Sequence, residues 1–282
     1  MTAAQDTITE PVGQLLRRWR GHRRMTQMDL ANRAEVSTRH VSFLETGRAK
    51  PTREMLLRLG EQLDIPLRDR NTLMLAAGFA PPYPEHVLSD VPMSTVVDAI
   101  AQILTAHDPL PAVVVDRHWN MVDANAAVGL LTDGAAARLL EPPVNVLRLS
   151  LHPEGMAPRI TNLGQWRAHV LQRIEHQIEA TGDPELRRLR DELAGYPSGQ
   201  DAVSRDAPAL VVPLRVRVNG HDLAFLSTTT VFGTPLDVTV SELAIESFYP
   251  ADGATTRFLT SDGPATAPGS AVARVTGRAA GG

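Results

Sequence analysis

Apolar residues recur at helical spacing through the first part of the chain. The inward positions of the first two predicted helices are Leu15, Leu16, Trp19, Leu30 and Ala31. Thr26 and Ser37 stand where helix N-caps are preferred, and Gly47 stands where a helix ends. A third helix therefore follows a short turn and runs from Ser37 to Gly47, and two further helices are predicted at about 52–63 and 66–77. Residues 12–79 are therefore predicted to form a compact domain of five short helices.

Later in the chain the pattern becomes that of strands and longer helices. AVVVD and MVDA flank a turn near residues 118–120, which predicts a hairpin that passes into a helix near Asn125. Residues 164–195 return to helical spacing. LVVPLRVRV and HDLAFLSTTTVF flank Asn219-Gly220, a dipeptide that suits a type I′ turn, and a further strand is predicted at about 240–248. An antiparallel sheet with helices is expected here, which makes the whole chain α+β.

Composition sets the predicted domain boundaries. The segment PPYPEH has three prolines in six residues and reads as a semi-rigid connection. We predict a linker and connecting helix at 80–110 and a second domain at 111–260. Residues 261–282 consist mostly of small and polar residues with little to bury, so a disordered tail is expected there.

The segment from Thr26 to Gly47 fits a helix-turn-helix, whose second helix enters the major groove of DNA. The side chains left to project from that helix are Ser37, Thr38, Arg39, His40 and Ser42. Gln27, at the start of the first helix of this motif, suits a phosphate contact. Arg48, Lys50 and Arg53 follow the second helix and suit contacts to the DNA backbone.

Charge is distributed as a nucleic-acid partner would require. Residues 17–53 hold ten basic and three acidic residues, whereas residues 86–282 hold 15 arginines and 22 acidic residues, in a chain of net charge −4. A basic domain joined to an acidic one is typical of a DNA-binding module fused to another function. A solvated basic helix would carry the same charge, so charge alone leaves both interpretations open.

The run MTQMDLANRAEVSTRHVSFLETGRAKPTREMLLRLGEQLDIP resembles the XRE (phage-repressor-like) helix-turn-helix family, over about residues 12–78. The resemblance implies that Ser37, Thr38, Arg39 and His40 face the bases of double-stranded DNA. It also implies a two-fold symmetric operator, and hence a homodimer. Phe43 stands where the family often has a polar residue, and we expect it to pack against the bundle and narrow direct readout.

The second domain resembles the MmyB-like ligand-binding domain of regulators. The stretches that carry the resemblance are VVDRHWNMVDANAA, PPVNVLRLSLHPEG, LGQWRAHVLQRI, VVPL and TPLDVTVSELAIESFYP. It implies a PAS-like fold, in which an antiparallel sheet with helices across one face encloses an apolar pocket. It also implies a small apolar, fatty-acid-like ligand, which composition by itself does not indicate.

Polar candidates for contact with such a ligand lie in the best-matching stretches: Asn125, Arg148, His152, Trp166 and Arg167. A charged side chain on a rigid element suits an acidic head group. These residues also have structural interpretations. Arg148 suits a surface salt bridge, His152 a loop, Trp166 the core and Asn125 the start of a helix.

Other classes of protein are disfavoured. The chain has no cysteine, which rules out disulfides, thiolate metal sites and cysteine nucleophiles. His169 and His176 lie too far apart for a zinc-protease pair, and the sequence has no nucleotide-binding or hydrolase motif. We therefore predict that the protein has no metal site and no cofactor and is not an enzyme. No apolar run reaches the ~18 residues of a membrane span, and the N-terminus lacks the pattern of a signal peptide, so a cytoplasmic protein is expected.

Two hypotheses follow from the sequence. The first is a sequence-specific transcriptional regulator whose C-terminal domain senses a small apolar ligand. The second is a helix-turn-helix adaptor that acts through protein–protein contacts, with a solid, ligand-free dimerisation domain. A packed core and a cavity produce the same alternation of apolar residues, so the sequence leaves both open.

Overall fold

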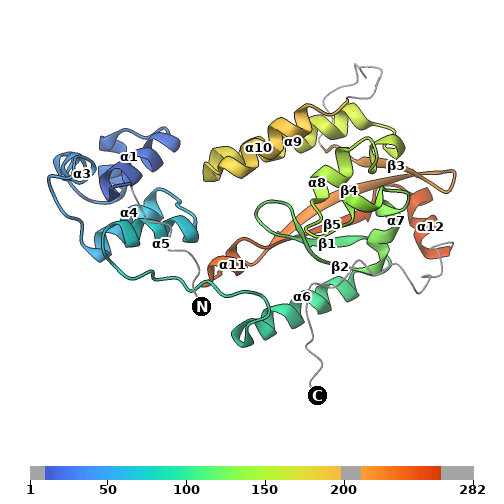
Figure 1. The fold of residues 1–282 in the computed structure, drawn as a ribbon, viewed down its shortest axis with the longest axis horizontal. Coiled ribbons are helices and arrows are strands. Elements are labelled where there is room, and N and C mark those ends of the chain that lie inside the picture. The colour runs from blue at the N-terminus through green and yellow to red at the C-terminus, as the bar shows by residue number, and fades with distance from the viewer. Residues whose placement is uncertain (1–9, 198–210, 262–282) are drawn as a thin grey trace. The chain divides into compact units, whose positions relative to one another are not determined.

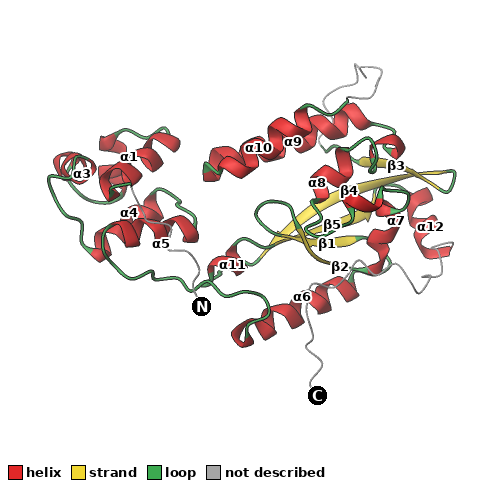
Figure 2. Cartoon of the chain, in the orientation of Figure 1, coloured by secondary structure: helices red, strands yellow, loops and turns green. Residues whose placement is uncertain are grey.

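The computed structural model describes residues 10–197 and 211–261 of the chain (Figure 1). These residues form two compact units, one chiefly of residues up to Glu85 and the other chiefly of residues from His86 onward. We call them the head and the body, and describe each by itself. The head is helical and the body combines a sheet with helices, as the predicted α+β class requires (Figure 2). In the described part of the chain, no helix has both the length and the apolar character needed to cross a membrane.

The described residues of the head form the five predicted helices: α1 (Val12–His22), α2 (Gln27–Arg33), α3 (Thr38–Glu45), α4 (Arg53–Gln62) and α5 (Leu67–Ala76). Their inward side chains form one apolar core, in which Leu16, Leu30 and Leu44 are among the fully buried residues. Gly13 lets α1 approach α3 closely, because a Cβ atom there would lie 2.4 Å from the carbonyl oxygen of Leu44.

Polar side chains cap the starts of three head helices. The hydroxyls of Thr26, Ser37 and Thr52 each accept a hydrogen bond from the backbone N–H three residues later, in α2, α3 and α4. Each cap satisfies an N–H group that a helix start leaves without an intrahelical partner. The predicted caps at Thr26 and Ser37 therefore set where the two central helices begin.

The proline-rich segment after α5 is bound to the head. The Asn71 side chain donates to the carbonyl oxygen of Tyr83 at 2.7 Å and accepts from its N–H at 3.2 Å. The Arg70 guanidinium donates to the Tyr83 hydroxyl at 3.3 Å. The sequence places this segment in a linker that begins at residue 80, whereas in the structure its first residues pack on α5.

The body is built on a five-stranded antiparallel sheet. Its strands are β1 (Ala112–Val115), β2 (Met121–Ala124), β3 (Leu214–Val218), β4 (His221–Val231) and β5 (Ala244–Pro250), in the order β2-β1-β5-β4-β3. The central strand β5 comes last in sequence. The turn between β3 and β4 has Asn219 and Gly220 at φ 48° and 81°, as expected for the predicted Asn-Gly hairpin.

Helices cover both faces of the sheet, whereas the family resemblance implied helices across one face. The α-helices of the body are α6 (Ser94–Ala106), α7 (Gly129–Thr132), α8 (Val146–Leu151), α9 (Leu163–Thr181), α10 (Pro184–Ala194), α11 (Val238–Ser241) and α12 (Gly253–Ser261), and short 3₁₀ turns lie at 91–93, 126–128, 137–139 and 157–159. Val113 and Val115 pack on the side of α9, whereas Ala112 and Val114 pack on the side of α6. Figure 1 shows α6 on one side of the sheet and α9 on the other.

Several elements differ from their predictions, and α8 lies in a stretch where no element was predicted. The strand β3 begins at Leu214, because Pro213 has no N–H to donate to a neighbouring strand. The late strand begins at Ala244, since residues 238–241 form the helical turn α11. The last helix, α12, was not predicted and ends at Ser261, and the rest of the predicted tail lies outside the described residues.

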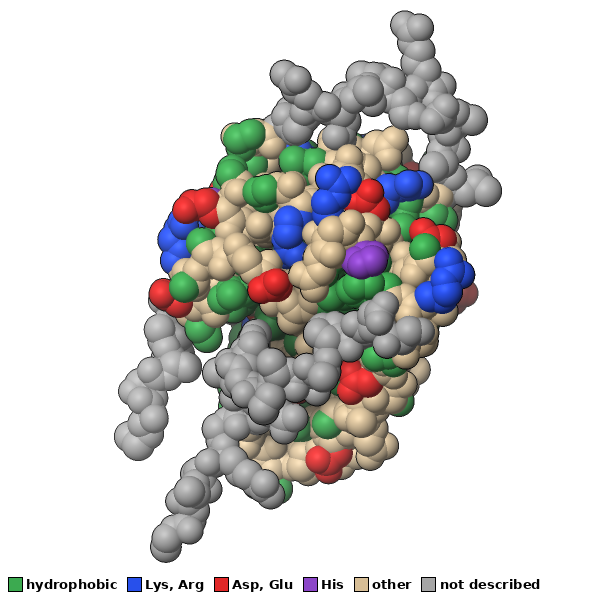
Figure 3. Space-filling view, turned by 90° about the vertical axis from the view of Figure 1, so that its right-hand side faces the viewer, with side chains coloured by type: hydrophobic (Ala, Val, Ile, Leu, Met, Phe, Trp, Pro, Cys, Tyr) green, Lys and Arg blue, Asp and Glu red, His purple; other side chains and the backbone are tan. Residues whose placement is uncertain are grey.

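In the view of Figure 3, acidic, basic and apolar side chains are interspersed over the body surface.

Candidate DNA interface and ligand cavity

The helix α3 has one face in the core and one face exposed. Val41, Leu44 and Glu45 are buried. The predicted contact residues are on the other side: Ser37, Thr38 and Arg39 are exposed, and His40 and Ser42 are half-buried. Beyond the helix, Arg48, Lys50 and Arg53 are exposed as well. The outward face of α3 therefore presents hydroxyl, imidazole and guanidinium groups in a basic setting.

Phe43 does not pack against the head's core, contrary to our expectation. Its half-buried ring is absent from the described apolar core cluster of the head. The ring instead lies 5.1 Å from the guanidinium carbon of Arg39, one helical turn earlier on the same face. An arginine stacked on an aromatic ring loses less conformational freedom when it binds. Arg39 and Phe43 thus form a paired surface on the outside of α3.

A buried ion pair ties α3 to α1 and α2. Arg20 donates to both carboxylate oxygens of Glu45, at 2.6 and 2.9 Å, and the Gln27 amide nitrogen donates to the same carboxylate at 2.8 Å. Burial opposes ionisation of Glu45, but the hydrogen bonds from Arg20 and Gln27 outweigh it and lower its pKa. The amide nitrogen of Gln27, expected to meet a phosphate, is therefore engaged within the head.

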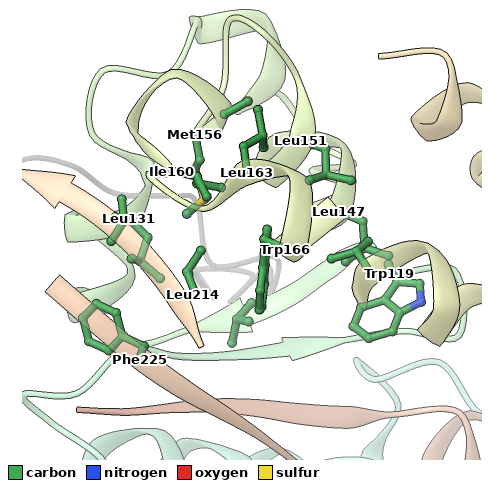
Figure 4. Packing of buried hydrophobic residues seen from close by; sticks show 14 of the residues in the cluster. Trp119, Leu131, Leu147, Leu151, Met156, Ile160, Leu163, Trp166, Leu214 and Phe225 are labelled. Carbon is green, nitrogen blue, oxygen red and sulfur yellow. The ribbon is translucent and has the colours of Figure 1, made fainter. Parts of the chain in front are cut away.

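The body contains a cavity of about 70 Å³ between the sheet and the helices α8 and α9. Its lining is mostly apolar and comes from β1, β2, β3, β5, α7, α8, α9 and the segments between them. The polar residues of the lining are Thr132, Ser150, Arg173 and Glu246. Figure 4 shows Trp166 within this packing, with Trp119 on one side of it and Leu131 on the other.

Arg173 and Glu246 form a charged pair in the lining of the cavity. Arg173 donates to the two carboxylate oxygens at 2.6 and 3.0 Å, and to the Thr229 hydroxyl at 2.7 Å. Thr229 in turn donates to Glu246 at 2.6 Å. The Glu246 side chain is 5% exposed and that of Arg173 is 27% exposed. The Trp119 ring centre lies 4.7 Å from the guanidinium carbon, which fixes Arg173 from a second side.

Trp166 is the predicted ligand residue that lines the cavity. Its indole N–H donates to the Ser150 hydroxyl at 2.9 Å, so the ring is oriented by a polar contact within an apolar lining. The His169 ring lies 5.4 Å from it. Burial and the positive charge of Arg173 lower the pKa of His169, against the opposing effect of Glu246. His169 is therefore neutral near pH 7 and adds no charge beside the cavity.

Asn125 does not line the cavity, and its side chain binds backbone atoms instead. Its side-chain oxygen accepts from the N–H of Ala112 at 3.0 Å, and its amide donates to the carbonyl of Leu110 at 2.7 Å. Both partners are backbone groups at the start of β1. Asn125 therefore satisfies buried backbone atoms where the first strand begins.

The other three predicted ligand contacts, Arg148, Arg167 and His152, contact α10 or the residues just after it, not the cavity. Arg148 holds Glu192 at 2.7 and 2.8 Å, and Arg167 donates to the carbonyl of Ala194. The His152 ring lies 5.1 Å from that of Tyr196. The helix α10 offers carboxylate and carbonyl acceptors near these side chains, which the sequence alone did not reveal. These contacts favour a structural role for Arg148, Arg167 and His152 over a ligand-binding one.

Sequence reasoning missed Arg173, Glu246 and Trp119. A signal existed for Arg173, which follows Trp166 by seven residues and so continues its helical stripe. A second signal was an acidic residue, Glu246, inside a predicted strand. The sequence separation of 73 residues between Arg173 and Glu246 gave no reason to pair them.

Comparisons with known proteins agree with this division of the chain. A family model described as the MmyB-like transcription regulator ligand binding domain matches residues 96–261, and a helix-turn-helix domain model matches residues 11–73. No curated protein matches the sequence. The structure of the clp gene regulator ClgR from Corynebacterium glutamicum is 22% identical, over 38% of this chain and 99% of its own, with a TM-score of 0.22. An RNA-binding light-oxygen-voltage receptor is 17% identical, over 92% and 67%, with a TM-score of 0.24.

The two structural likenesses are too distant to carry an argument about function, whereas the family matches coincide with the observed fold. The helix-turn-helix match falls on the helices of the head. The other match spans the sheet of the body with its covering helices and makes up more than half of the chain. The protein is thus a DNA-binding transcription regulator, and it belongs to the family defined by the MmyB-like ligand-binding domain.

Proposed function

We propose that this regulator binds a specific operator through α3 and that a small apolar, fatty-acid-like ligand in the body controls the binding. The observation that carries the DNA half is the exposed, basic face of α3, in which Arg39 and Phe43 are turned away from the core. The observation that supports the ligand half is the apolar cavity lined by Trp166.

The base contacts of the proposal come from the outward face of α3. Arg39 suits a bidentate contact to the O6 and N7 atoms of a guanine. Phe43 offers an apolar surface beside it, which suits the C5-methyl group of a neighbouring thymine. Thr38, His40 and Ser42 lie on or next to this face and complete the proposed readout.

The backbone contacts of the proposal come from the ends of the helices. Ser37 caps α3 and is exposed at its start, where a phosphate is favoured. Arg48, Lys50 and Arg53 supply positive charge after the helix. Gln27 acts as a positioning residue, because its amide nitrogen holds Glu45 at the end of α3.

One head covers only a few base pairs, so we propose a homodimer on two half-sites. In this geometry the two recognition helices enter successive major grooves, about 34 Å apart, on a two-fold symmetric operator. Light scattering of the free protein and of its DNA complex tests this. A monomer in both states would contradict the dimer without affecting the readout by α3.

The cavity is small for the ligand that we propose. Its volume of about 70 Å³ is roughly half that of an engineered cavity of ~150 Å³ that admits benzene. A longer acyl chain therefore requires the surrounding side chains to move, and such movement would couple ligand binding to the conformation of the body. Trp166, Met156 and Leu131 are the residues we expect to move.

Selection of bound oligonucleotides from a random pool, with the full chain at moderate salt, tests the regulator. We expect one symmetric sequence to be enriched and its complex to weaken steeply as salt rises. The adaptor hypothesis predicts no enriched sequence. Native mass spectrometry of the purified protein, followed by a thermal-shift screen of acyl chains, tests the ligand. A body that binds none of them would be a dimerisation platform.

A further inference from the structure

The charged pair in the cavity lining determines what a ligand meets there. Arg173 holds both oxygens of Glu246, and the carboxylate is almost wholly buried. Because the two charges cancel, a ligand that reaches this part of the cavity meets no net charge. A carboxylate placed beside Glu246 would add a second anion to a poorly solvated site, which is costly unless Glu246 gives up Arg173.

The pair still has hydrogen-bonding capacity. A guanidinium carries five N–H donors, and the bonds to Glu246 and Thr229 use three of those of Arg173. An ionised carboxylate has about four acceptor sites, and Arg173 with Thr229 fills three of those of Glu246. A hydroxyl or a primary amide both donates and accepts, so it can use the remaining capacity of both residues.

We propose that the ligand of this cavity is an apolar molecule with an uncharged polar head group, an alcohol or a primary amide, bound jointly by Arg173 and Glu246. The proposal rests on the ligand-sensing half of the proposed function. It keeps the apolar chain of a fatty-acid-like ligand and replaces the ionised carboxylate by a neutral head group. The apolar part of the ligand lies against Trp166 and the aliphatic lining. Trp119, stacked on Arg173, is a positioning residue for the head group.

Four six-carbon probes that differ in their head group test the proposal on the full-length protein: hexan-1-ol, hexanamide, hexanoate and hexylamine. Near neutral pH the first two are uncharged, the third is an anion and the fourth a cation. Dissociation constants from NMR or calorimetric titration give the comparison. We expect the alcohol and the amide to bind at least about tenfold more tightly than either charged probe.

The variant Glu246→Gln tests the cause of this preference. It removes the negative charge and leaves Arg173 as an uncompensated cation, so hexanoate should gain about tenfold in affinity relative to hexan-1-ol. The matched control is Glu192→Gln. That residue is also held by an arginine, Arg148, through two short hydrogen bonds, but it lies outside the cavity lining. The control should leave the order of the probes unchanged.

The outcomes separate this inference from the function on which it rests. If hexanoate binds the wild-type protein as tightly as hexan-1-ol, the head-group inference is wrong while ligand sensing stands. If none of the four probes binds, both are overturned. Should Glu246→Gln fail to fold, as judged by circular dichroism, the wild-type series decides the question by itself. DNA selection with the same protein is an independent measurement.

Discussion

Arg39 and Arg53 are both exposed arginines of the head, but they occupy different places relative to the proposed groove. Arg39→Ala should cost about 1 to 3 kcal/mol of binding free energy and relax the preference at one base pair, because a bidentate guanine contact is lost. Arg53→Ala should weaken all sequences alike. Competition binding against a panel of single-base operator variants measures both effects. An Arg39→Ala protein with unchanged preferences would remove Arg39 from the readout.

Phe43 allows a second test of the proposed DNA contacts at the level of a single residue. Replacing the thymine next to the contacted guanine by uracil removes only the methyl group, and we expect affinity to fall by about 1 kcal/mol. The variant Phe43→Ala should bind both operators equally, since the apolar surface is gone. A wild-type protein that does not distinguish thymine from uracil at any operator position would contradict the methyl contact.

Glu45 connects a single carboxylate to the stability of the head. Its pKa is lowered in the folded state, so its contribution is complete above the unfolded value of about 4.3 and is lost as the pH falls through the folded value. Glu45→Gln should cost about 3 kcal/mol near neutral pH, because Arg20 keeps a buried charge without its partner, and should flatten the loss on acidification. Hydrogen exchange of α1 and α3 amides measures this. Glu61→Gln, at an exposed position of α4, is the control.

At the level of elements, the contact between α1 and α3 positions the recognition helix. Gly13→Ala places a Cβ atom 2.4 Å from the carbonyl oxygen of Leu44 and 2.8 Å from that of Glu45, both backbone atoms of α3. The helices must separate, so we expect a loss of about 1 to 3 kcal/mol in stability and weaker DNA binding. Thermal unfolding and operator titration provide the measurements.

Gly21 in the same helix is the matched control. A Cβ atom there meets nothing within 4 Å, so Gly21→Ala should be neutral or stabilise the head by up to about 1 kcal/mol through helix propensity. Equal effects of the two substitutions would show that the packing of α1 on α3 does not determine the position of the recognition helix.

For the whole molecule, the prediction is a coupling free energy between ligand and DNA. A ligand changes operator affinity only by its differential affinity for the two states of the protein, and about 1 to 3 kcal/mol, or about 5- to 150-fold, is the usual size. The change must be reciprocal, so saturating operator DNA should shift the ligand dissociation constant by the same factor. Titrations in both orders measure it. Unequal factors would indicate that the two sites are not at equilibrium with one another.

Local features of the chain determined much of the fold. The caps at Thr26 and Ser37, the stripe that begins at Trp166 and the Asn219-Gly220 turn each depend on neighbours a few residues away. Such signals act over one or two helical turns or a single hairpin, which is the range that a sequence pattern covers. The five-helix head and the class of the body could therefore be predicted.

Only the tertiary structure decided how distant segments meet. It turned Phe43 outward against Arg39, directed Arg148 and Arg167 to α10, and brought Arg173 to Glu246 across 73 residues of sequence. The sequence by itself determined which residues are apolar, where the helices of the head begin, and which family the chain resembles. It did not determine the polar groups of the cavity, because a cavity is made where several elements pack together and no single segment contains its geometry.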